Sequence, residues 1–224
     1  MSGDLWASDD TARWEARLES FWDVAAAPAV GGKKSRGDGV PLLELERWYQ
    51  QELPARLATP PPPGRNELER LMDWKLTRGT WRPRLLDFVK ALAEEDASAA
   101  WAAALAALPQ KGGGDCPPAA LRAAIAALAA LKGVGPATAS AALSSADASV
   151  PFMSDEALTA ALGKKEYTVG AAVSLAAALQ AKARALSEAV GRRWTAREVE
   201  RALYAEAMAG AAAPGGEKKR KRKR

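Results

Sequence analysis

The amino-acid sequence predicts an all-α fold, and two observations support that prediction. Apolar residues recur at helical spacing from the start of the chain, as Trp14, Leu18, Phe21 and Trp22 illustrate. No run of alternating apolar and polar residues is long enough to predict a β-strand. The alanine-rich segments also favour helices, but alanine carries no functional group and therefore says little about activity.

The N-terminal part is expected to hold one helix and a linker. Asp9 and Asp10 are candidate N-caps for the helix that contains Trp14. The glycine- and lysine-rich stretch "GGKKSRGDG", residues 31–39, predicts a flexible connection. We therefore assign residues 1–40 to an N-terminal helix and flexible linker that precede the main helical domain.

The next segments alternate between helix and proline-rich connection. "PLLELERWYQQEL", residues 41–53, opens with a proline that suits the first turn of a helix. "TPPPPGRN", residues 59–66, cannot be helical because its prolines lack backbone donors. Asn66 and Glu69 then predict a capping box for the following helix.

Helical patterns continue to the end of the domain. Thr195 and Glu198 predict a second capping box, which opens a last helix that reaches about Met208. The other helices expected in this part of the chain cover residues 82–95, 97–108, 118–131, 136–144, 155–162 and 169–190.

The basic character of the chain belongs to its C-terminus. The formal net charge is +5, whereas the last eight residues, "EKKRKRKR", alone carry +6 and leave −1 for the rest. Residues 211–224 are therefore predicted to form a disordered basic tail that acts as a nuclear-localisation signal or a nucleic-acid-binding arm. A tail that only improves solubility is the alternative.

The composition excludes several function classes. The chain has no histidine, which excludes His-based catalysis and His-ligated metals. Its single cysteine, Cys116, excludes an intrachain disulfide and a four-cysteine iron–sulfur cluster. No apolar run reaches the roughly 18 residues of a membrane span, so no membrane partner is expected.

The stretch "LKGVGPATAS", residues 131–140, is the most informative in the chain. Gly133 and Gly135 let the backbone turn sharply and expose its N–H groups, because glycine has no Cβ and tolerates positive φ. Pro136 suits the first position of the next helix, whose N-terminus favours an anion such as phosphate. The side chain of Val134 can fill the apolar interior of the turn. The alternative is an ordinary hairpin of two helices without a ligand.

The longer string "LKGVGPATASAAL" resembles the helix–hairpin–helix motif of a DNA glycosylase superfamily (HhH-GPD) that includes endonuclease III and adenine DNA glycosylase. In that superfamily a catalytic aspartate follows the second glycine by about 20 residues, and here Asp155 in "VPFMSDEAL" lies 20 residues after Gly135. The resemblance implies a two-lobed helix–hairpin–helix DNA glycosylase-like fold. The implied ranges are 41–210 for the domain, about 66–162 for a six-helix lobe, and 41–58 plus 169–208 for the second lobe.

The sequence departs from the superfamily pattern at several positions. Lys132 stands where proline is frequent, and Glu156 follows the aspartate where a Thr-His pair is common. Ala137 occupies the position of the lysine in members that also cleave the DNA backbone, so the resemblance implies a monofunctional enzyme without a lyase step. "WKLTRGTWRPRLLDF", residues 74–88, together with "PFMSDEA", is similar to a divergent eukaryotic branch without an iron–sulfur cluster.

Asp155 is the candidate catalytic residue. In the first turn of a helix, where Ser154 or Asp155 can act as the cap, a carboxylate is stabilised in its ionised form. Such a group can stabilise the positive charge that develops at the sugar C1′ as a base leaves, and it can orient or deprotonate the attacking water. The alternative is an ordinary N-cap aspartate.

The remaining candidates surround these two motifs. Lys75 could face Asp155 across the pocket, or serve as an amine nucleophile in place of the missing lysine. For Trp74 and Tyr49 a place in the core is the alternative to a place in the pocket. The residues expected to contact DNA are Lys132, Gly133, Val134, Gly135, Ala137, Thr138, Lys75, Arg78 and Arg82, and the candidate pocket residues are Trp74, Tyr49 and Met153.

The residues and the resemblance together predict a nuclear base-excision repair protein. It is expected to bind double-stranded DNA as a monomer and to hydrolyse the N-glycosidic bond of a damaged or mismatched base. No cofactor is expected, except that the resemblance allows a K⁺ or Na⁺ ion on the Gly133–Gly135 backbone. Two other classes stay open: a DNA-binding module of the same fold that has lost catalysis, and a helical protein-interaction domain with a nuclear tail.

Overall fold

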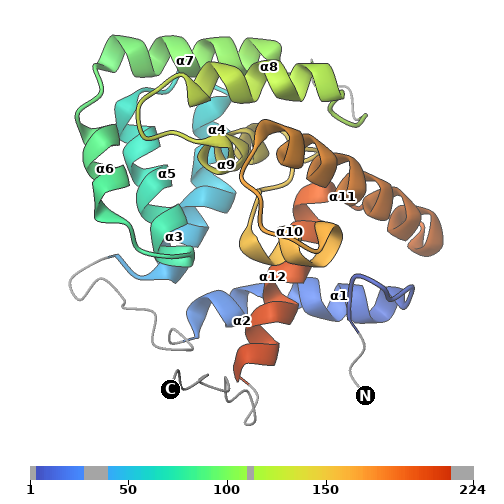
Figure 1. Ribbon diagram of the computed structural model, residues 1–224. Helices are drawn as coiled ribbons and strands as arrows, with labels where there is room; N and C mark the ends of the chain where they lie inside the picture. Colours follow the sequence, from blue (N-terminus) through green and yellow to red (C-terminus); the bar gives the residue numbers. More distant parts are fainter. Residues whose placement is uncertain (1–3, 28–39, 110–113, 213–224) are drawn as a thin grey trace, which may run out of the picture.

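The computed structural model describes residues 4–27, 40–109 and 114–212 (Figure 1). Within these ranges every regular element is a helix, which confirms the predicted all-α class. The linker expected at residues 31–39 and nearly all of the basic tail expected at residues 211–224 lie outside the described residues.

Short helices form the first part of the described chain, and longer helices form the rest. Their order is α1 (Thr11–Glu19), α2 (Phe21–Ala26), α3 (Leu42–Arg47), the π-helical segment η1 (Trp48–Glu52), α4 (Leu53–Leu57), α5 (Arg65–Arg78), α6 (Pro83–Lys90), α7 (Glu94–Ala107), α8 (Pro118–Ala129), α9 (Pro136–Ala146), α10 (Asp155–Leu162), α11 (Val169–Val190) and α12 (Ala196–Ala212).

Two helices, α10 and α11, begin and end at the predicted residues because both ends carry local signals. Ser154 and Thr168 cap their starts through side-chain oxygens that accept backbone N–H groups. Gly163 and Gly191 follow their ends in the left-handed conformation, which glycine adopts without strain.

The capping box predicted at Thr195 is confirmed, whereas the box predicted at Asn66 is wrong. Thr195 Oγ1 accepts the N–H of Glu198 at 3.2 Å, and the Glu198 carboxylate accepts the N–H of Thr195 at 2.7 Å. Helix α5 begins one residue before Asn66, and there Glu67 accepts the N–H of Gly64 at 2.9 Å. Helix α5, which follows the proline-rich stretch, therefore begins earlier in the chain than the sequence pattern predicts.

Helix α9 forms the centre of the fold. Its residues from Thr138 to Ser145 are all buried, and α4, α5, α7, α8 and α11 pack around it. Alanine and serine dominate this helix, so neighbouring helices can approach it closely. In Figure 1, α7 and α8 lie side by side at the top, α5 and α6 lie at the left, and α11 lies at the right.

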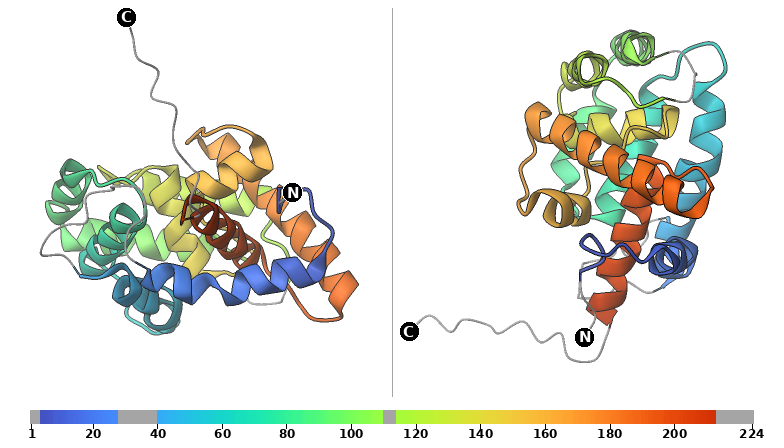
Figure 2. Two further views of the ribbon diagram at one scale, coloured as in Figure 1. Left: turned by 90° about the horizontal axis from the view of Figure 1, so that it is seen from below. Right: turned by 90° about the vertical axis from the view of Figure 1, so that its right-hand side faces the viewer.

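The N-terminal helices pack on the same core. Leu5 and Trp14 are fully buried in the main hydrophobic cluster, and α1 crosses α12 (Figure 2). Arg13 of α1 forms an ion pair with Glu206 of α12. The boundary predicted at residue 40 therefore does not set the N-terminal helix apart from the helical domain.

Candidate functional site

One pocket of about 270 Å³ brings together most of the residues that the sequence singled out. Its wall comes from the end of α5, the turn between α8 and α9, the first turn of α9, and the segment that leads into α10. Two helix starts, those of α9 and α10, therefore open onto the same space. The predicted residues that line it are Lys75, Arg78, Arg82, Gly133, Gly135, Ala137, Thr138, Met153 and Asp155.

The turn between α8 and α9 uses its two glycines differently. Gly133 has a φ of +90°, and a Cβ there would lie 2.7 Å from the Cβ of Phe88. Gly135 has a φ of −98°, and a Cβ there would have no described heavy atom beyond its chain neighbours within 4 Å. The turn geometry therefore depends on Gly133, whereas the missing side chain at Gly135 leaves open space over a helix start.

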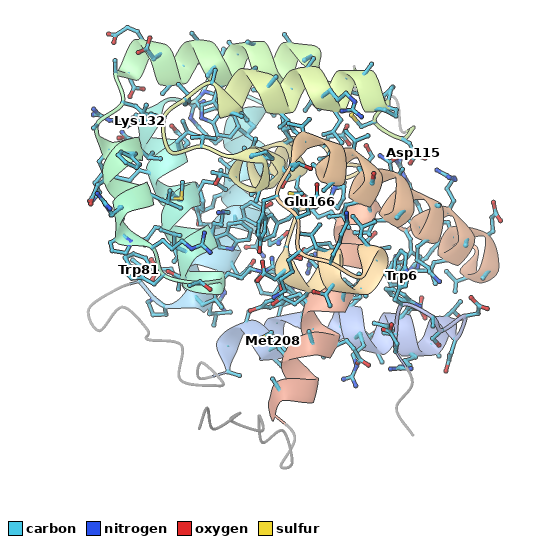
Figure 3. All side chains as sticks on the ribbon, in the orientation of Figure 1. Trp6, Trp81, Asp115, Lys132, Glu166 and Met208 are labelled. Carbon is cyan, nitrogen blue, oxygen red and sulfur yellow. The ribbon has the colours of Figure 1, made fainter. Side chains whose placement is uncertain are left out.

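The start of α9 is suited to hold an anion. Pro136 is the first helical residue, as predicted, and none of the described side chains caps the helix. Pro136 has no N–H, and the N–H of Thr138 bonds to the Gly135 carbonyl at 2.9 Å. The N–H of Ala137 is therefore the helix donor that can meet an anion, and the helix dipole adds positive potential. Val134 and Thr138 are buried, so their side chains are not open to DNA. Lys132 is exposed, with its Nζ 4.7 Å from the ring centre of Phe88 on α6 (Figure 3).

Asp155 is the first residue of α10, but it is not the cap. Ser154 fills that role, since its Oγ accepts the N–H of Ala157. The Asp155 carboxylate accepts the Tyr167 hydroxyl at 2.6 Å on one oxygen and the Lys165 ammonium at 2.9 Å on the other. The ion pair with Lys165 is half-exposed and therefore adds little stability. Its effect is to fix the orientation of the carboxylate.

Sequence reasoning missed Lys165 and Tyr167. Both lie in the loop between α10 and α11, where Figure 3 labels their neighbour Glu166 near the centre of the view. Tyr167 is 44% exposed, which is unusual for a large aromatic side chain, but exposure is a property of the fold and no local sequence pattern signals it. Burial and the hydrogen bond to Asp155 raise the pKa of Tyr167 to about 12, so its hydroxyl remains a donor at neutral pH.

The segment that leads into α10 is positioned by a serine and by stacked aromatic rings. Ser140 of α9 accepts the N–H of Met153 at 2.9 Å. Phe152 packs against Trp74 with ring centres 5.1 Å apart, and Trp74 stacks on Tyr49 at 3.7 Å. Trp74 and Tyr49 are buried and do not line the pocket, so their prediction as pocket residues is wrong and the core alternative holds. Met153 does line the pocket.

Lys75 carries the chemically unusual amine of the pocket. It is half-buried at the end of α5 and lines the same space as Asp155. Burial, together with the positive charge of Arg82, lowers the pKa of Lys75 to about 8, while Asp155 acts in the opposite direction. Compared with an ordinary lysine, this shift increases the neutral fraction of the amine roughly 300-fold near neutral pH.

Arg78, which was predicted to contact DNA, is engaged inside the core. Its side chain is buried between Glu46 of α3 and Glu200 of α12, with N–O distances of 3.5 Å and 2.7 Å. Its guanidinium carbon also lies 3.9 Å from the ring centre of Tyr204. Burial opposes its charge, but Glu200 and Glu46 outweigh that effect and raise the pKa of Arg78. Arg78 thus joins three helices inside the core.

The described part of the chain holds no group of three or more His, Cys, Asp or Glu residues that could bind a metal ion. Within the same ranges, no helix has the length and apolar character that crossing a membrane requires. Comparison of the chain with protein-family models, curated proteins and solved structures finds no match. The described part of the chain is thus an all-helical fold with a pocket at two helix starts.

Proposed function

We propose that this protein binds double-stranded DNA over the pocket and hydrolyses the N-glycosidic bond of a damaged or mismatched base. The observation that carries the proposal is the convergence of Asp155 and the Gly133–Gly135 turn on one pocket. A backbone site for a phosphate and a fixed carboxylate beside it are what this reaction requires. Nuclear location belongs to the same proposal and rests on the basic C-terminal sequence.

The DNA-binding part of the proposal is supported by the distribution of exposed backbone and positive charge. The start of α9 is uncapped, and Gly135 leaves it open to a phosphate. Lys132 at the turn and Arg82 at the start of α6 are both exposed, and Arg82 also lines the pocket. Cations of this kind neutralise neighbouring phosphates and fix the register of the duplex, without reading its sequence.

The chemical part of the proposal is supported by the way the carboxylate is held. A nucleotide must leave the base stack before a protein can act on its base, and the pocket provides a place to receive it. Asp155 then stabilises the positive charge that grows at C1′ and orients the attacking water. Tyr167 and Lys165 keep the carboxylate in one orientation, which reduces the reorganisation needed during the reaction.

A screen of DNA duplexes tests this function. Each duplex bears one uracil, alkylated, oxidised or mismatched base, and alkali reveals the abasic sites that excision leaves. Asp155→Asn should lower excision by about two orders of magnitude or more, as for the loss of one electrostatic stabiliser. Folding should survive because Ser154 provides the cap of α10. Glu156→Gln, which removes a charge one residue further on, is the matched control and should keep most of the activity.

The outcome also separates the proposal from its main alternative. That alternative is a DNA-binding module without catalysis, and it is favoured by the engagement of both Asp155 oxygens with Lys165 and Tyr167. It predicts the same salt-dependent DNA binding but no excision of any base in the screen. Excision that is equally fast in the wild type and in Asp155→Asn would also contradict the proposed role of Asp155.

A further inference from the structure

Ser140 is a buried polar residue that connects the two helix starts of the pocket. It lies one turn into α9, is 2% exposed, and makes two hydrogen bonds through its hydroxyl. It donates to the carbonyl of Ala137 at 3.0 Å and accepts the backbone N–H of Met153 at 2.9 Å. Ala137 belongs to the first turn of α9, and Met153 precedes Asp155 by two residues. One side chain therefore joins the residue whose N–H can meet a phosphate to the segment that carries the carboxylate.

Helix stability and packing alone do not account for a serine at this position. Its neighbours on both sides are alanines, and alanine is a better helix former than serine. A buried hydroxyl also costs free energy unless it is hydrogen-bonded. The segment before α10 supplies the reason, because residues 151–154 are buried outside any helix and the N–H groups there need partners. The Ser140 hydroxyl provides the partner of the Met153 N–H.

The proposed reaction makes the spacing of the two helix starts important. A phosphate that flanks a nucleotide is joined to its C1′ by a few covalent bonds, so the distance between the two varies little. A protein that holds the phosphate at one helix start and acts on C1′ from another must keep its own groups at a matching distance. A misplacement of about 1 Å can slow a reaction about 100-fold. A fixed link between α9 and the segment before Asp155 therefore affects the rate of the reaction.

We propose that Ser140 is a positioning residue that sets the distance between a phosphate bound at the start of α9 and the carboxylate of Asp155. Ser140 does not line the pocket, so it acts through other residues. Its two hydrogen bonds hold Ala137 and Met153 at one distance. The next residue is Ser154, the cap of α10, which carries that distance to Asp155. The catalytic half of this inference rests on the proposed function, whereas the link itself can be tested without excision.

The first experiment measures kcat and KM for excision with the full-length proteins. Ser140→Ala should lower kcat at least about tenfold and change KM less than about twofold, because the phosphate donor stays on α9 while the carboxylate loses its fixed distance. Ser140→Cys has nearly the shape of serine but is only a weak hydrogen-bond acceptor, so it should have the same effect without leaving a cavity.

Ser145→Ala is the matched control. Ser145 is buried in the same helix, and its hydroxyl donates to the Ala141 carbonyl at 3.4 Å. Among the described residues it has no hydrogen bond to residues 150–154, so the same substitution here leaves the link intact. This variant should keep the kcat of the wild type.

The second experiment tests the link without DNA. Inorganic phosphate is titrated into the full-length protein, and nuclear magnetic resonance follows the backbone amide signals of Ala137 and Met153. In the wild type both signals should shift with the same apparent Kd, because phosphate meets the N–H of Ala137 and the bonds of Ser140 reach Met153. In Ser140→Ala the signal of Ala137 should still shift, whereas the signal of Met153 should not. The same spectra establish that each variant is folded.

The outcomes separate the inference from the proposed function. Wild-type kcat in both Ser140→Ala and Ser140→Cys would refute the positioning role and leave the proposed excision intact. A Met153 signal that shifts equally in Ser140→Ala, or an Ala137 signal that does not respond to phosphate, would also overturn the inference. Spectra that show the link in a protein that excises no base would support the link and refute the proposed function.

Discussion

A negative charge placed on the start of α9 tests the proposed phosphate site most directly. Gly135 is the N-cap of this helix, with an ordinary φ of −98° and open space where a Cβ would lie. Aspartate fits this position and is also among the best N-cap residues, so the helix should not be weakened. Gly135→Asp therefore separates an effect on DNA binding from an effect on folding.

The two effects differ in size and in sign. At the N-cap, exchange of glycine for aspartate should change the free energy of unfolding by a few tenths of a kcal/mol, in the stabilising direction. A carboxylate about 5 Å from a phosphate charge costs about 3 kcal/mol at an effective dielectric constant of 20, and about 0.8 kcal/mol in bulk water. A loss between these limits weakens DNA binding about 4- to 150-fold.

Fluorescence anisotropy titrations of a duplex with the full-length proteins measure this loss. Gly135→Asn is the matched control, because asparagine has nearly the same shape and capping ability but no charge. The basic C-terminal segment is present in all proteins and cancels in the comparison. If one phosphate contact is lost, the slope of log K against log salt concentration should also become shallower by about 0.9.

The reasoning is refuted if a folded Gly135→Asp protein binds the duplex as tightly as both Gly135→Asn and the wild type. In that case no phosphate lies at the start of α9 in the complex. Equal weakening by both substitutions would show that side-chain bulk, and not charge, disturbs the interface. Chemical denaturation of each variant establishes that the compared proteins are folded.

Four other perturbations have definite expected outcomes. Gly133→Ala should lower the free energy of unfolding by about 1–2 kcal/mol in urea titrations, because a side chain at φ +90° is strained; an unchanged midpoint would contradict this. Arg78→Ala should cost about 3–5 kcal/mol by the same assay, since it leaves buried carboxylates unpaired, whereas normal stability with weaker DNA binding would restore a role as phosphate ligand. Tyr167→Phe should slow excision about tenfold at an unchanged melting temperature, because one hydrogen bond to a charged group is lost; wild-type rates would argue against its positioning role. Deletion of residues 218–224 should make the salt dependence of DNA binding shallower and abolish nuclear accumulation of the protein, and unaltered distribution in cells would rule out an import signal.

Part of the site was predictable because its signals are local. Pro136 begins α9 and Ser154 caps α10, and both starts follow from residue types that act within one turn of backbone. The resemblance to a superfamily in which an aspartate follows the second glycine by about 20 residues, as Asp155 follows Gly135, then implied that the two helix starts belong together. The pocket that they share is consistent with that indication.

By itself, the sequence determined where most helices lie, because caps, prolines and helical spacing are properties of neighbouring residues. Only the tertiary structure decided what the charged residues do. Lys75 and Arg78 lie three positions apart on α5 and look equivalent in the sequence, yet the Lys75 side chain is half-buried without an ion pair to a described residue and the Arg78 side chain is buried between Glu46 and Glu200. The partner of Arg78 on α12 is 122 residues away along the chain. Burial and ion pairing depend on which helices pack together, and no local pattern encodes contacts at that separation.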